Sequence, residues 1–129
     1  MNKKVINDEM QYAYDALAEA KIADKDGKIE KTYRGQISSF GAAVTMGSLR
    51  PAIAFFSKDA NNGEGSDVQR SKLMKAVLIV LKKAGKAEES LETLYDYTKV
   101  KTEDVCKEDI INAAISLKLA MNLYVLKES

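Results

Sequence analysis

The sequence predicts an all-α protein of about six helices, packed in one compact bundle that spans residues 1–129 as a single domain. Three observations predict this fold class. Apolar residues recur at helical spacing, one proline and seven glycines punctuate the chain, and no segment alternates between apolar and polar residues over more than a few positions. Apolar residues make up 46% of the 129 residues, which is enough to build a hydrophobic core. We therefore expect helices and no β-strand.

The first two helices follow from caps, glycines and spacing. Asn7 or Asp8 is a suitable N-cap for a first helix that extends to about Asp24, and Gly27 supplies a stop. The second helix is predicted by an apolar stripe whose members are spaced four, four, three and four residues apart. These members are Ile29, Tyr33, Ile37, Phe40 and Val44.

The middle of the chain is predicted to form a short helix, a loop and a longer helix. The short, apolar helix runs from Leu49 to Lys58. A polar, glycine-containing loop follows over residues 59–66. Ser66 or Asp67 is then expected to cap a fourth helix that reaches about Lys86.

Two further helices complete the expected bundle. The fifth is predicted from Glu88 to Tyr97, and the sixth from about Glu103 to Lys127. The apolar residues of the sixth helix recur at helical spacing. They are Val105, Ile110, Ala113, Ala114, Leu117, Ala120, Met121 and Tyr124.

The composition argues against the common catalytic and metal-binding sites. The chain contains no histidine, which excludes Ser-His-Asp and Cys-His nucleophile pairs and every metal site that uses histidine. Cys106 is the only cysteine, so neither an intramolecular disulfide nor a thiolate zinc cluster can form. We expect a small, packed thiol at Cys106 and a protein that is not an enzyme and needs no cofactor.

The N-terminal residues lack the apolar segment of a signal peptide. The longest strictly aliphatic run covers residues 76–81, far fewer than the ~20 residues that a membrane span needs. We therefore expect a cytoplasmic protein without a membrane partner.

Residues 24–30 resemble the middle of a calcium-binding EF-hand loop. When Gly27 is placed at the sixth loop position, Ile22 occupies the first position, where a carboxylate is needed. Tyr33 then occupies the twelfth position, where the bidentate glutamate belongs. Two of the strongest ligands are missing, so we interpret this segment as a turn that ends a helix.

Charge placement is the most informative feature of the sequence. Residues 68–87 contain six basic residues and no acidic one, and residues 88–109 contain eight acidic residues and three lysines. Five lysines of the fourth helix fall within an arc of about 100° opposite its apolar face. They are Lys72, Lys75, Lys82, Lys83 and Lys86. Such a face is suited to a phosphate backbone, but a merely solvated face, or docking against an acidic surface of another copy, would use the same residues.

The order of several short motifs resembles the small, fifth subunit of the Cmr complex, the type III-B CRISPR–Cas effector that targets RNA. The similarity covers roughly residues 10–126. The motifs are Gln11-Tyr12-Ala13-Tyr14, Tyr33, Gly47-Ser48-Leu49, Ala54-Phe55-Phe56-Ser57-Lys58, and the final helix from Lys107-Glu108 to Leu117-Lys118-Leu119-Ala120. The chain departs from the family at Gly41, where proline is usual, and at Ser48, which separates the glycine from the leucine.

This resemblance implies a non-catalytic, helical subunit that stacks along the channel for guide RNA and target RNA. It implies as partners the large subunit, the repeated backbone subunits and further copies of the same protein. Of a basic pair that is common in the family's final helix, only Lys118 is present, so Lys118 joins the five lysines as a candidate RNA contact. The alternative hypothesis is a helical adaptor that binds protein without contacting nucleic acid.

Overall fold

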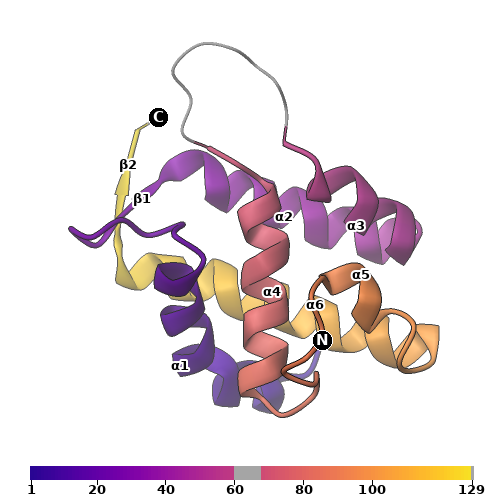
Figure 1. Cartoon of the computed structure of the whole chain (residues 1–129). Coiled ribbons are helices and arrows are strands. Elements are labelled where there is room, and N and C mark those ends of the chain that lie inside the picture. The colour runs from indigo at the N-terminus through magenta and orange to yellow at the C-terminus, as the bar shows by residue number, and fades with distance from the viewer. Residues whose placement is uncertain (60–67, 129) are drawn as a thin grey trace.

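The computed structural model describes residues 1–59 and 68–128, and it confirms a predominantly helical, bundle-like fold (Figure 1). Six α-helices pack around one hydrophobic core, and two short strands lie at its edge. None of the helices in these residues is both long enough and apolar enough to cross a membrane. The elements are α1 (Lys3–Glu19), β1 (Lys28–Glu30), α2 (Lys31–Met46), α3 (Leu49–Ser57), α4 (Ser71–Lys83), α5 (Leu94–Tyr97), α6 (Glu103–Ala120), the 3-10 turn η1 (Met121–Leu123) and β2 (Val125–Lys127).

The core lies where α6 meets three other helices. Helix α6 packs against α1, α2 and α4, and α4 also packs against α1, so α4 crosses in front of α6 in Figure 1. The apolar stripe that predicts the second helix is buried, but only its members from Tyr33 to Val44 lie on α2. Ile29, which was expected on the same helix, belongs to β1. The largest fully buried side chains are Tyr33, Tyr97, Phe40, Leu17, Ile29, Ile37, Ile53, Leu73, Leu81, Ile110, Leu117 and Met121.

The first helix begins earlier and ends earlier than the sequence predicts. Asn2, rather than Asn7 or Asp8, is the N-cap, because its side-chain oxygen accepts a hydrogen bond from the Val5 backbone N–H at 3.1 Å. Helix α1 ends at Glu19, and Lys21 then adopts a left-handed φ of 62°. That reversal turns the chain back toward β1.

The expectation of no strand is wrong. Strands β1 and β2 form a parallel pair in which Lys28 lies opposite Val125, and Glu30 lies opposite Lys127. The last helix accordingly ends at Ala120, and the chain becomes extended well before Lys127. The strands of three residues each are too short to show alternation, and their partners lie at opposite ends of the sequence.

The fourth and fifth helices are shorter than predicted. Helix α4 ends at Lys83, since Gly85, with a φ of +76°, turns the chain before Lys86. Helix α5 spans only Leu94–Tyr97 and begins at a capping box in which Thr93 and Asp96 exchange hydrogen bonds. The predicted caps Ser66 and Asp67, and the expected loop after Asp59, lie outside the described residues.

Candidate nucleic-acid interface

The five lysines predicted on the fourth helix do not form one free cationic face. Lys83 lies 2.8 Å from a carboxylate oxygen of Glu19, and the Nζ of Lys82 donates to the backbone carbonyl of Glu89 at 3.0 Å. Helix α1 supplies Glu19 through its packing on α4, which no local sequence pattern reveals. Two of the five lysines are thus already engaged on the surface.

Lys86 is partly buried, and its ammonium contacts two carboxylates that pack against the core. Its Nζ lies 3.0 Å from the carboxylate of Glu9 and 3.8 Å from that of Asp109. Glu9 is 2% exposed, and burial raises the pKa of its carboxyl. The expectation that Lys86 belongs to a cationic face opposite the apolar side of the helix is therefore wrong, because Lys86 is the cation that partners a buried carboxylate.

Lys72, at the other end of α4, lies in a hollow of about 240 Å³. Three lysines from other segments line the same hollow: Lys21 after α1, Lys28 on β1 and Lys127 on β2. We call this site the basic hollow. Its remaining lining residues are Ile22, Asp24, Glu30 and Tyr33.

The charges in the basic hollow do not cancel. Lys127 lies 3.5 Å from carboxylate oxygens of both Asp24 and Glu30. Within residues 1–59 and 68–128, Lys21, Lys28 and Lys72 form no ion pair with a carboxylate, although the Nζ of Lys72 donates to the backbone carbonyl of Lys21 at 3.2 Å. The hollow therefore carries an excess of positive charge.

A turn holds the rim of the basic hollow in place. The Oδ1 of Asp24 accepts hydrogen bonds from the backbone N–H groups of Asp26 at 2.9 Å and Lys28 at 3.0 Å. The hydrogen bond from the Lys28 N–H group is the main reason why the pKa of the Asp24 carboxyl is lowered. Gly27 completes the turn with a φ of +75°. In the segment that resembles a calcium loop, the carboxylate of Asp24 thus accepts hydrogen bonds from the backbone of its own turn.

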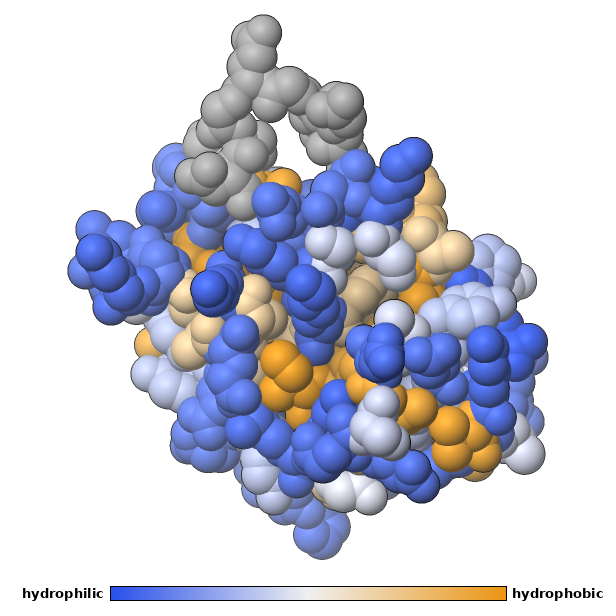
Figure 2. Space-filling view, in the orientation of Figure 1, coloured by the Kyte–Doolittle hydropathy of each residue, from blue (hydrophilic) through white to orange (hydrophobic). Residues whose placement is uncertain are grey.

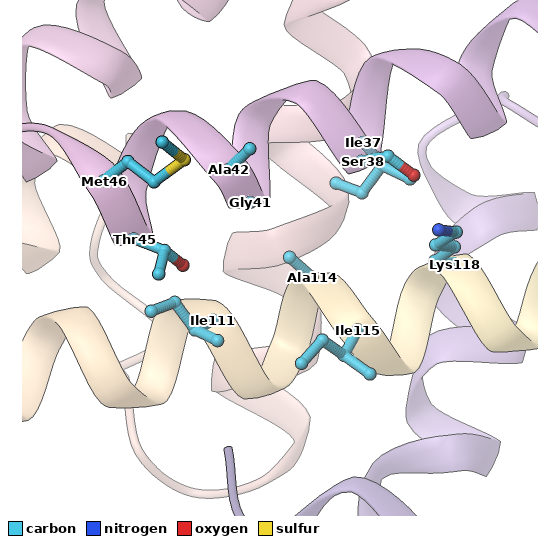
Figure 3. A pocket seen from close by; sticks show the side chains of 10 residues that line it. All are labelled: Ile37, Ser38, Gly41, Ala42, Thr45, Met46, Ile111, Ala114, Ile115 and Lys118. Carbon is cyan, nitrogen blue, oxygen red and sulfur yellow. The ribbon is translucent and has the colours of Figure 1, made fainter.

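Lys75 and Lys118 lie outside the basic hollow. Lys75 is exposed on α4, one turn after Lys72, so it extends the basic surface along the helix. Lys118 lies on α6, at one end of an apolar groove between α2 and α6 (Figure 3). The groove is lined mainly by apolar side chains, and its polar lining residues are Ser38, Thr45 and Lys118. Its volume is about 400 Å³.

Figure 2 shows that the face viewed in Figure 1 is mostly hydrophilic, with hydrophobic residues exposed in separate patches.

Cys106 is fully buried, and its Sγ donates to the carbonyl of Tyr97 at 3.4 Å. Burial raises the pKa of this thiol, which makes it a packed thiol as expected. The described residues contain no cluster of three or more acidic or cysteine side chains arranged to hold a metal ion.

Sequence reasoning found Lys72 but missed the three lysines that share its hollow. Lys21, Lys28 and Lys127 come together because β2 returns beside β1, and no pattern in the sequence indicates this pairing.

Comparisons with protein-family models, with curated proteins and with solved structures find no match to this chain.

Proposed function

We propose that the protein is a non-catalytic structural subunit of a Cmr complex, the type III-B CRISPR effector that targets RNA, and that its basic hollow binds the phosphate backbone of RNA. In this role it works in the cytoplasm, in antiviral defence. Its partners are the large subunit, the repeated backbone subunits, further copies of itself, and the guide and target RNAs.

The observation that supports the RNA contact is the convergence of Lys21, Lys28 and Lys72, none of which is paired with a carboxylate of the described residues. Lysine is a flexible point charge that offsets phosphate charge without reading bases. Lys75 continues the same basic surface along α4. Such an arrangement favours binding that depends on the backbone of RNA and not on its sequence. The motif resemblance is what supports the choice of a Cmr complex.

The second candidate function is a helical adaptor that binds only protein, and the apolar groove favours it. Ile111 and Ile115 of α6 line this groove together with Ala42 and Met46 of α2 (Figure 3), and the side chain of Met46 is largely exposed. Apolar surface that remains open to solvent is typical of a protein contact. Under this hypothesis the lysines only keep the protein soluble.

RNA titrations at several salt concentrations separate the two candidates. The triple variant Lys21→Glu, Lys28→Glu, Lys72→Glu should bind two unrelated single-stranded RNAs more weakly, and by the same factor. Loss of three phosphate contacts should flatten the log–log salt dependence by about 2, since each contact to a single strand contributes about 0.7. Fluorescence anisotropy with the isolated protein and with the assembled complex measures both quantities.

A control variant with the same change in charge is Lys3→Glu, Lys4→Glu, Lys99→Glu, which alters exposed residues of α1 and of the turn after α5. It should leave the salt dependence unchanged. Equal losses in both triple variants would show that only net charge matters. Unchanged RNA binding in the first variant would favour the adaptor.

A further inference from the structure

Phe55 on α3 is a large aromatic side chain that is 61% exposed. The guanidinium carbon of Arg70 lies 4.2 Å from the centroid of its ring, and the Phe56 ring packs edge-on against it at 5.3 Å. Arg70 is fixed in turn, because its Nε donates to the backbone carbonyl of Lys58 at 2.7 Å. A planar cation and an aromatic ring are thus stacked at the surface, where both remain available to a third planar group.

A shallow hollow of about 480 Å³ adjoins this stack. Besides Phe55, Phe56 and Arg70, it is lined by one face of α2, which includes Gly35, Gln36 and Ser39. We call it the aromatic hollow. At Gly35 there is open space where a side chain would stand, so the backbone of α2 can be approached closely. The volume exceeds that of a single aromatic side chain by a wide margin.

The aromatic hollow also contains an unsatisfied polar atom. The Oε1 of Gln36 is buried and has no hydrogen-bond partner among the described residues. Arg70 is the only charged residue that lines the hollow within the described part of the chain, and it favours a ligand that carries negative charge.

We propose that the aromatic hollow binds one unpaired nucleobase of RNA. The base stacks on the Phe55–Arg70 pair, beside the face of α2 that contains Gly35, Gln36 and Ser39. Stacking on aromatic and guanidinium planes is how proteins hold the splayed bases of single-stranded RNA. This inference rests on the proposed RNA-binding function and adds a site for bases to the site for phosphates.

Adenosine, which carries no phosphate, tests the aromatic hollow separately from the basic hollow. In amide NMR spectra of the whole chain, millimolar adenosine should shift the backbone signals of Gly35, Gln36 and Ser39. Phe55→Leu should abolish these shifts, and Phe55→Tyr should keep them, because tyrosine retains a ring for stacking. Absence of shifts in the unaltered protein would overturn the inference.

RNA binding supplies the second readout. Phe55→Leu should weaken the affinity for single-stranded RNA by about fivefold to 150-fold, the range typical for loss of one stacked base, and should leave the salt dependence unchanged. Tyr95→Leu is a matched control, since Tyr95 is an exposed ring with Lys99 at 5.4 Å but does not line the aromatic hollow. Equal losses in both variants would overturn the inference.

The two proposals can fail independently. If the triple variant of the basic hollow flattens the salt dependence but Phe55→Leu leaves the affinity for RNA unchanged, the base site is excluded and the phosphate site stands. Adenosine shifts that persist while the basic hollow has no effect on RNA affinity would remove the phosphate site and leave the base site.

Discussion

The Nζ of Lys86 lies 3.0 Å from the Oε2 of Glu9, although the two residues are 77 positions apart in the chain. The same ammonium lies 3.8 Å from Asp109, whose other carboxylate oxygen accepts a hydrogen bond of 2.6 Å from the hydroxyl of Tyr97. These contacts join α1, the turn after α4, α5 and α6 in one polar network. The network lies against the apolar core, where a missing partner is costly.

Replacing Lys86 by alanine should lower the free energy of unfolding by about 3–5 kcal/mol, because the buried carboxylate of Glu9 loses its cation. Urea denaturation followed by circular dichroism measures this change. Lys75→Ala is the matched control, since Lys75 is exposed on α4, and it should change stability by about 0.5 kcal/mol or less. Equal effects of the two substitutions would contradict the role of the network.

The pH dependence of stability should reveal Glu9. Burial raises the pKa of its carboxyl above the ordinary 4.5, against the opposing effect of Lys86. The folded protein then binds this proton more tightly than the unfolded chain does. The contribution of Glu9 is thus most favourable at low pH, and it declines as the pH rises from about 4.5 through the raised pKa.

The stability of the unaltered protein relative to Glu9→Gln should therefore decrease with pH across this window and become constant above it. Urea denaturation at a series of pH values checks the trend. Asp8→Asn is the control, because a hydrogen bond from Lys4 lowers the pKa of the Asp8 carboxyl below 3.8. Its stability difference should stay constant over the same window. A difference for Glu9→Gln that rises with pH would contradict the prediction.

Tyr97→Phe should destabilise the protein by about 1.5–3 kcal/mol, the range for loss of a hydrogen bond to a charged group. Burial and the bond to Asp109 raise the pKa of the Tyr97 hydroxyl, so it remains a donor at all ordinary pH values. Thermal and urea denaturation measure the loss. Tyr95→Phe, at an exposed ring on the same helix, should have almost no effect, and a comparable loss there would exclude this explanation.

Two glycine substitutions should change stability in opposite directions. Gly27→Ala places a side chain at a φ of +75° and should cost about 1–2 kcal/mol. Gly41→Ala lies inside α2 with open space around the new methyl group, and it should stabilise the protein by about 0.5–1 kcal/mol. Urea denaturation measures the change in the free energy of unfolding for each variant. The prediction requires the two changes to have opposite signs.

The helices could be predicted from the sequence where an apolar stripe runs along one face. The stripe from Tyr33 to Val44 is the clearest case, and all of its members are buried. The ends of the helices were less predictable, because they depend on caps and turns. Asn2 caps α1 through one side-chain hydrogen bond, and Thr93 caps α5 through a reciprocal pair with Asp96. Neither residue precedes a long apolar repeat.

The candidate site could be predicted only in part, because charge along one helix does not reveal what packs beside it. Lys83 and Lys86 have the same spacing as a solvated face, but α1 brings Glu19 and Glu9 to meet them. Lys72 was found, whereas Lys127 reaches the same hollow only through the pairing of β1 with β2. Contacts between the two ends of a chain leave no local signature.

The pairing of β1 with β2 also sets an order of assembly during synthesis. Strand β1 is translated well before β2, because the two strands are far apart in the sequence. Closing a loop between two strands so far apart in the sequence is entropically costly and comes late in folding. Until then Asp24 and Glu30 lack the cation of Lys127, so their negative charge opposes an approaching phosphate. A nascent chain therefore presents no finished basic hollow until β2 has been translated and has paired with β1.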